Sequence, residues 1–116
     1  MKTRIPTAEE FTRALKNIDK PRDKRLQFLQ NHYHTPGRVC TARLLAESVG
    51  YTGHGGVNLW YGKLARQIAE VLRVRNPGQW LSLLVQFANP PALTNRECIL
   101  VMRQEFAEAL RAARWV

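Results

Sequence analysis

The spacing of hydrophobic and polar residues predicts a helix at the start of the chain. Thr7 and Glu10 have the spacing of a capping box, in which each side chain accepts a hydrogen bond from the other residue's backbone amide. Apolar residues then recur at helical intervals, at Phe11, Leu15 and Ile18. The first helix is therefore expected from about Thr7 to Asn17.

A second helix is expected after Asp19, which can cap its N-terminus and leaves Pro21 in the first turn. Its buried face would carry Leu26, Leu29 and Tyr33. The segment HTPGR, which combines proline with glycine, then ends the helical pattern.

A third, short helix is predicted in ARLLAESV, where Thr41 can act as the cap. Leu44, Leu45 and Val49 would form its buried stripe, and Gly50 can adopt the left-handed conformation that closes a helix. The glycine-rich turn YTGHGG follows, and its glycines allow a large change of chain direction because they accept positive φ values.

The fourth helix, VNLWYGKLARQIAEVLR at 57–73, has the most regular pattern. Its apolar residues recur every three to four positions, at Val57, Trp60 or Tyr61, Leu64, Ile68 and Leu72. The polar residues Asn58, Gly62, Arg66 and Arg73 fall on the opposite face, with Lys63 and Gln67 beside them.

A β-hairpin and a last helix are expected beyond the breaker NPG at 76–78. The segment 81–87 alternates in the two-residue period of a strand, with Leu81, Leu83, Val85 and Phe87 toward the core and Ser82, Leu84 and Gln86 away from it. ANPPALTNR at 88–96 cannot pair regularly, and ECILVMR at 97–103 is the return strand. A short helix at 104–114 would bury Phe106, Ala109, Leu110 and Ala113.

This order of elements is that of a winged helix-turn-helix. The sequence thus predicts a mainly α single domain over residues 1–116 with a small β-hairpin. In that fold the helix after the turn lies in the major groove of duplex DNA, so helix 57–73 would read bases and loop 88–96 would be the wing. Asn pairs with adenine, Arg with guanine, and Lys with phosphates. Candidate contacts are Asn58, Lys63, Arg66, Gln67 and Arg73 on the helix, His54 in the turn, Arg96 in the wing, and Lys24 and Arg25 in the basic N-terminal segment.

Several of these residues have a second interpretation, because a polar helix face is often only solvated. Gly62 costs about 1 kcal/mol relative to alanine inside a helix, and either close packing against the third helix or close approach of a phosphate would explain it. Tyr51, Trp60 and Tyr61 are either core residues or a surface on which bases stack.

The charge of the chain favours an anionic partner. Lys and Arg number 18 against 9 for Asp and Glu, which gives a net charge of +9, and residues 1–40 hold nine of the cations. Nucleic acid is the first candidate. The start of the chain lacks the apolar run of a signal peptide, and no stretch has the roughly 18 apolar residues of a membrane span, so a cytoplasmic protein is expected. Cys40 and Cys98 lie in apolar surroundings and are expected to be small core residues.

Catalytic and metal chemistry have little support in the sequence. His32 and His34 point to different sides whether their segment is helical or extended, and no set of potential ligands has the spacing of a zinc site. Ser48 and Ser82 lie outside any nucleophile elbow, and the glycine turn lacks the Lys-Ser/Thr of a phosphate-binding loop. The chain is therefore expected to be no enzyme and to use no metal or cofactor.

A stretch of the chain resembles a known module. HYHTPGRVCTARLLAESVGYTGHGGVNLWYGKLARQI, with the later strand and VMRQEFAEALRAARWV, is similar over residues 26–116 to a small winged-helix-like module found N-terminal to bacterial HNH-type endonucleases and related restriction-like proteins. The matching positions are Thr41, Val49, Gly50, Tyr51, Asn58, Tyr61, Gly62, Met102, Arg103 and Glu105. The resemblance implies target recognition on DNA, with a nuclease domain or subunit as a partner. No HNH domain is present in this chain, so nuclease activity does not carry over.

The sequence thus favours a duplex DNA-binding or target-recognition module. Two alternatives stay open. One is a protein-interaction module of a phage or defence-system regulator, whose basic face would meet an acidic protein. The other is a small nuclease, or a reader of modified bases that feeds a nuclease, which would use the glycine turn and its aromatic residues.

Overall fold

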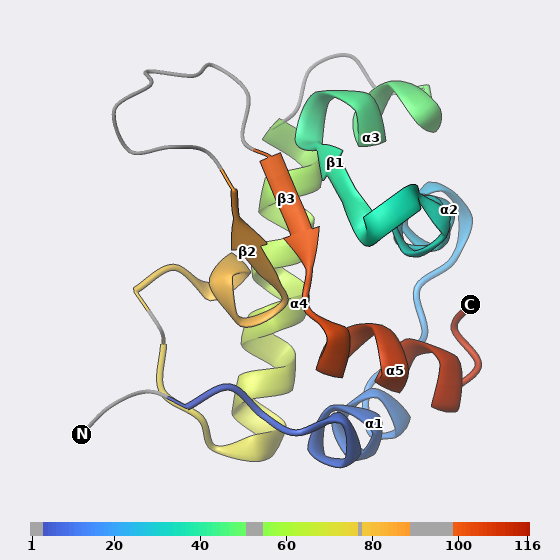
Figure 1. Cartoon of the computed structure of the whole chain (residues 1–116). Coiled ribbons are helices and arrows are strands. Elements are labelled where there is room, and N and C mark those ends of the chain that lie inside the picture. Colours follow the sequence, from blue (N-terminus) through green and yellow to red (C-terminus); the bar gives the residue numbers. More distant parts are fainter. Residues whose placement is uncertain (1–3, 51–54, 77, 89–98) are drawn as a thin grey trace.

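Helices predominate in residues 4–50, 55–76, 78–88 and 99–116, which the computed structural model of the chain describes (Figure 1). The α-helices are α1 (Ala8–Lys16), α2 (Asp23–His34), α3 (Ala42–Ser48), α4 (Gly55–Leu72) and α5 (Gln104–Ala112). Two 3-10 helices, η1 (Pro36–Arg38) and η2 (Trp80–Leu83), and three strands, β1 (Val39–Thr41), β2 (Val85–Phe87) and β3 (Ile99–Met102), complete the order. The radius of gyration, 13.5 Å, is that of one compact domain of this length.

Helix α1 begins where its sequence signal places it. The capping box between Thr7 and Glu10 is present, so this prediction is confirmed. Arg4 holds both carboxylate oxygens of Glu10 at 2.6 Å, and this hydrogen-bonded ion pair lowers the pKa of Glu10 to about 2. On the buried side, the ring of Phe11 packs edge to face on Phe106 with centroids 5.6 Å apart, which joins α1 to α5.

Helix α2 begins later than predicted. The expected cap at Asp19 is wrong: the helix starts at Asp23, and Arg22 occupies the N-cap position without a side-chain hydrogen bond. The physical reason is the backbone of Asp23, whose φ of 58° is left-handed and cannot continue a helix from Pro21. The buried residues of α2 are Phe28, Leu29 and His32, whereas Leu26 and Tyr33 are only half-buried.

Helix α3 follows the prediction except at one position. Thr41 caps it by accepting a hydrogen bond from the Leu44 amide, and Gly50 closes it with a φ of 82°. Leu45 and Val49 are buried, but the expected burial of Leu44 is wrong, because half of this residue is exposed. Ala42 and Ala46 take the buried positions instead.

The predicted hairpin is part of a three-stranded antiparallel sheet in the order β1-β3-β2. Strands β2 and β3 pair as expected, with Val85 opposite Met102. Strand β1 was not predicted: it pairs with the other side of β3, with Cys40 opposite Leu100. Leu100 and Met102 turn one face of β3 into the core.

The expected strand over 81–87 is wrong in its first half. Trp80–Leu83 form η2, and only Val85–Phe87 are extended. The amide of Leu84 bonds to the carbonyl of Leu81 across the 3-10 turn, and both of these side chains are buried. Phe87, which was expected to face the core, is 39% exposed.

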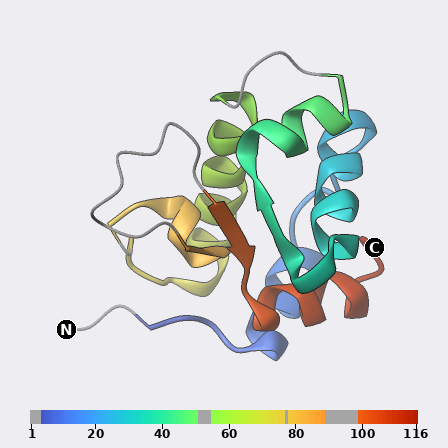
Figure 2. The same ribbon diagram turned by 45° about the horizontal axis from the view of Figure 1, so that its top comes forward.

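Helix α4 is the central element of the fold. In two views it passes behind the sheet, with α1 and α5 together near one end of it (Figures 1 and 2). Its apolar stripe is buried as predicted, and of the two aromatic alternatives it is Tyr61 that is fully buried. The core therefore lies between α4, the inner face of β3 and the helices α1, α2 and α5.

Candidate nucleic-acid interface

The exposed side of α4 carries several of the predicted contact residues. Lys63, Arg66 and Gln67 are exposed there, as expected from their spacing. Leu59, one turn before Lys63, is 62% exposed, which is unusual for an apolar residue on a helix that also has a buried stripe. This face is therefore mixed, with cations, an amide and one apolar side chain.

Arg66 has a partner on its own helix. Its Nε donates to Glu70 at 3.2 Å, and both side chains are about two-thirds exposed. An exposed pair of this kind contributes only a few tenths of a kcal/mol to stability. The guanidinium can therefore exchange this carboxylate for a phosphate or a base at little cost.

Asn58 is less accessible than predicted. It is half-buried, and its Oδ1 is buried with no hydrogen-bond partner. An unpaired buried acceptor costs about 1 to 3 kcal/mol of stability. A hydrogen bond from a donor to Oδ1 would therefore be favourable. Arg73 also departs from the prediction: α4 ends at Leu72, and the left-handed φ of 56° at Arg73 takes it out of the helix face.

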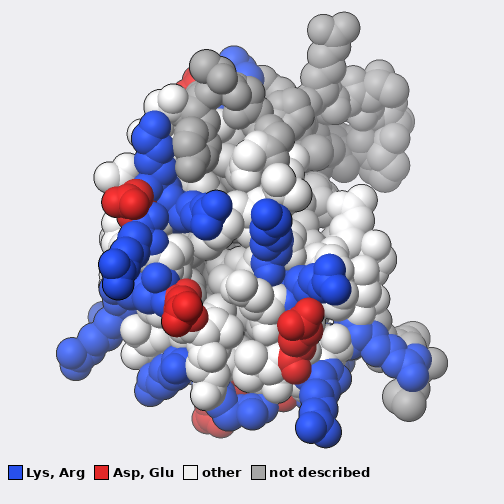
Figure 3. Space-filling model, turned by 180° about the vertical axis from the view of Figure 1, so that it is seen from behind, with Lys and Arg blue, Asp and Glu red and all other residues white. Residues whose placement is uncertain are grey.

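A cationic groove of about 860 Å³ lies between α4 and the segment that joins α1 to α2. Lys20, Arg22 and Arg25 line one side and Gln67 lies on the other. Asp19 is the one carboxylate among the described lining residues, and Trp60 of α4 is also among them. Figure 3 shows the molecule from behind, with many Lys and Arg side chains spread over that face and fewer Asp and Glu side chains among them. The basic N-terminal segment and the polar face of α4 thus border the same groove.

Lys24, the neighbour of Arg25, is not among the residues that line this groove. Its Nζ lies 3.6 Å from the position that a Cβ of Gly50 would occupy, at the end of α3. Lys24 is thus placed against the C-terminal end of α3, where a cation complements the helix dipole. Lys24 and Arg25 nevertheless line one smaller hollow together with Arg22, at the start of α2.

A second groove, of about 660 Å³, lies on the other flank of α4. Its wall is formed by η2 and β2, and its lining is mainly apolar. The apolar members are Leu59, Trp80, Leu81 and Phe87, and the polar ones are Asn58, Lys63, Arg66 and Gln79. Gly62 of α4 also lines this groove.

Of the two explanations considered for Gly62, close packing against the third helix is wrong, because a Cβ at this position would meet no atom within 4 Å.

The histidines form no metal site in the described part of the chain, where no group of three or more His, Cys, Asp or Glu residues could hold a metal ion. His32 is fully buried and has three polar contacts. Its Nε2–H donates to the carbonyls of Arg38 and Leu100 at 3.0 and 3.1 Å, and its Nδ1 accepts from the Tyr61 hydroxyl at 2.8 Å. Burial lowers the pKa of His32, although both carbonyl contacts oppose this effect. The pattern of the sequence gave no sign of this network, because its members are far apart in the chain.

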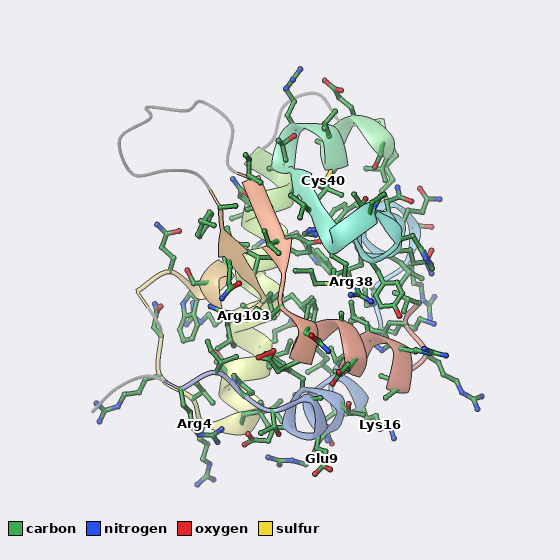
Figure 4. The ribbon with its side chains drawn as sticks, viewed as in Figure 1. Arg4, Glu9, Lys16, Arg38, Cys40 and Arg103 are labelled. Atoms are coloured by element: carbon green, nitrogen blue, oxygen red, sulfur yellow. The ribbon has the colours of Figure 1, made fainter. Side chains whose placement is uncertain are left out.

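Two partly buried side chains connect the sheet to its surroundings (Figure 4). Arg103 Nε donates to the carbonyl of Ser82 at 3.0 Å and so joins the end of β3 to η2, while burial lowers its pKa. Cys40 on β1 is a half-buried free thiol packed against the core, and burial raises its pKa. Both residues support the sheet rather than line either groove.

Several predicted contact residues lie outside the described residues. These are His54 and Tyr51 in the glycine turn and Arg96 in the 88–96 wing, of which only Ala88 is described. The core position expected for Cys98 also falls outside them. Among the described residues, no helix is both long enough and apolar enough to cross a membrane.

In comparisons with known proteins, no family model matches this chain, and no curated protein or solved structure is similar enough to count as a match. The chemistry of its own surface is therefore the basis for a functional proposal.

Proposed function

We propose that this chain is a duplex DNA-binding module that uses α4 as its reading helix. The observation that carries the proposal is the cationic groove, which has a volume of about 860 Å³ and is lined by Arg22 and Arg25 on one side and by Gln67 of α4 on the other. Cations beside a polar helix face suit the phosphates of one DNA strand. With a net charge of +9, the whole molecule also attracts a polyanion.

A winged helix-turn-helix arrangement is part of this proposal. In that fold a strand precedes the helix-turn-helix and pairs with the hairpin that follows it. Here β1 precedes α3 and α4, and it pairs with β3 on the side away from β2. The missed strand therefore supports the winged-helix interpretation more strongly than a lone hairpin would.

The proposal divides the contacts by chemistry. Arg22, Arg25 and Lys63 are suited to phosphates, and Arg66 is suited to a phosphate or to guanine once it leaves Glu70. Leu59 offers an exposed apolar contact for the methyl group of thymine. The resemblance of residues 26–116 to modules beside HNH endonucleases supports the same role, and a nuclease domain or subunit is then the partner that we propose.

A salt titration tests DNA binding. The affinity of the chain for a random duplex should fall as salt rises, with a log-log slope of about −0.9 for each phosphate contacted and roughly 3 to 6 contacts for a module of this size. Fluorescence anisotropy with a labelled duplex measures this slope. A flat response would refute duplex binding and favour the alternative of a protein-interaction module.

Matched charge variants locate the surface. Replacement of Arg22 and Arg25 by alanine should reduce the slope by about two units, because two phosphate contacts are lost. The control removes the same charge from Arg13 and Arg111, which are exposed and do not line the groove. If both double variants lose affinity equally, only the net charge matters and the groove is not the binding surface.

A further inference from the structure

Gly62 has no structural reason to be glycine in the described part of the chain. It lies in the middle of α4, where glycine costs about 1 kcal/mol relative to alanine. Its φ is not left-handed, and a Cβ at this position would have no atom within 4 Å. Neither the backbone nor internal packing therefore requires glycine. What its missing side chain does provide is access to the backbone of α4 from the apolar groove.

The apolar groove beside Gly62 is open to solvent at several large side chains. Leu59 is 62% exposed and Phe87 is 39% exposed, while Trp80 is half-buried on the opposite wall. Burial of such surface by a ligand is favourable in proportion to its area. Aromatic side chains in this position also provide a surface on which a flat ring can stack.

The rim of this groove is cationic. Lys63 and Arg66 border it on α4, and no Asp or Glu is among its described lining residues. A ligand that fits both features has a flat apolar part and carries negative charge beside it. A nucleotide has this combination, because the faces of its base are apolar and its phosphate is anionic.

Asn58 supplies a polar group at the same place. It lines the groove, and its buried Oδ1 has no partner. A terminal amide can both donate and accept, so Asn58 suits the polar edge of a base bound in this groove.

We propose that the groove between α4, η2 and β2 receives one unpaired or extruded base of the bound nucleic acid. The base lies against Trp80 and Phe87 with its edge toward Asn58, and Lys63 and Arg66 hold the adjacent phosphates. This inference rests on the proposed DNA binding and specifies what one flank of α4 recognises. An acidic, amphipathic protein segment is the competing occupant.

Three labelled duplexes of the same sequence test the proposal. The first is fully paired, the second has one extra unpaired thymidine as a bulge, and the third has an abasic nucleotide in that bulge. The bulged duplex should bind about ten-fold more tightly than the paired one, since a stacked base adds affinity. The abasic bulge has a similar bend but no base, so it should bind like the paired duplex.

The variant Gly62→Leu tests the groove itself. Because a Cβ at Gly62 meets no atom within 4 Å and leucine is the better helix former, its melting temperature should not fall below that of the parent chain. Its side chain should occupy the groove and abolish the ten-fold preference for the bulged duplex. The readout is the ratio of the two affinities measured on this variant, because Gly62 lies on the face of α4 that is proposed to contact DNA and the absolute affinity can change with it. The control Ala112→Leu places a leucine at an exposed position of α5, and it should leave both the melting temperature and the ten-fold preference unchanged.

The outcomes separate this inference from the proposed function. If the parent chain binds paired and bulged duplexes equally, or Gly62→Leu keeps the preference, the groove takes no base although duplex binding stands. If no duplex binds, both proposals are wrong. If a synthetic peptide of alternating Glu and Leu binds the parent chain but not Gly62→Leu, and the bulge gives no preference, the occupant is a protein segment.

Discussion

Replacement of Tyr61 by phenylalanine should destabilise the fold by about 1 to 3 kcal/mol. The ring is fully buried, and its hydroxyl donates to His32 Nδ1 at 2.8 Å. Phenylalanine fills the same space but leaves this nitrogen buried without a donor, and an unpaired buried group costs that amount. His32 cannot avoid the cost by exchanging tautomers, because its Nε2 would then face two carbonyl oxygens without a proton.

The size of the effect follows from what the hydrogen bond connects. His32 lies on α2 and Tyr61 on α4, and the second ring nitrogen of His32 holds β3 through the carbonyl of Leu100. Loss of the hydroxyl therefore weakens the contact among α2, α4 and β3, which are far apart in the sequence. Urea unfolding should show a lower midpoint with an unchanged slope, because the surface exposed on unfolding stays the same.

Tyr33→Phe is the matched control. Tyr33 is half-buried, and its ring contacts the guanidinium of Arg38, which lies 4.7 Å from the ring centroid, and the ring of His34, with centroids 5.0 Å apart. Removal of its hydroxyl should change stability by no more than about 0.5 kcal/mol. An equal loss in the two variants, or no loss in Tyr61→Phe, would refute the assigned role of the hydrogen bond between His32 and Tyr61.

Two further predictions concern the core. Because the folded state holds His32 neutral with a lowered pKa, only the unfolded chain takes up this proton as pH falls below about 6.5, so the free energy of unfolding should fall by up to about 1.4 kcal/mol per pH unit there. The NMR signals of the His32 imidazole should remain those of a neutral ring in the folded protein over this range, and protonation of the ring there would contradict the prediction. Leu83→Ala should cost about 2 to 5 kcal/mol since Leu83 is fully buried in η2, whereas half-buried Ser82→Ala should cost little in thermal unfolding, and similar costs would mean that η2 is wrongly placed.

The parts of the fold that the sequence predicted depend on short-range signals. The box of Thr7 and Glu10, the cap at Thr41 and the closing Gly50 each act within one turn of a helix. The apolar stripe of α4 also repeats every turn, so the helix and its buried face follow from local spacing. Such signals do not require knowledge of what the helix packs against.

The elements that were missed depend on residues far apart in the chain. Strand β1 has only three residues, and its pairing partner Val101 lies about sixty residues after Val39. The leucines of 81–84 suit a strand as well as a tight helical turn, and only the burial of both Leu83 and Leu84 separates the two. A pattern within a single segment cannot distinguish these cases.

The candidate interface was predicted in part for the same reason. The spacing placed Lys63, Arg66 and Gln67 on one side of α4, and they are exposed there. It could not show that the α1–α2 segment borders one flank and η2 the other, because both contacts are long-range. Asn58 was expected to be exposed on helical spacing alone, but it is half-buried beside the groove that η2 and β2 form.

The two flanks of α4 together argue for nucleic acid more strongly than either does alone. One flank is a cationic groove and the other is an apolar groove with a cationic rim, and both are lined by residues of α4. A protein partner would need an acidic stretch on one side of α4 and an apolar side chain on the other. A nucleic acid offers charge and a flat apolar ring in every nucleotide. Lys63 and Arg66, at the rim of the apolar groove, would then contact the backbone that joins the two sites.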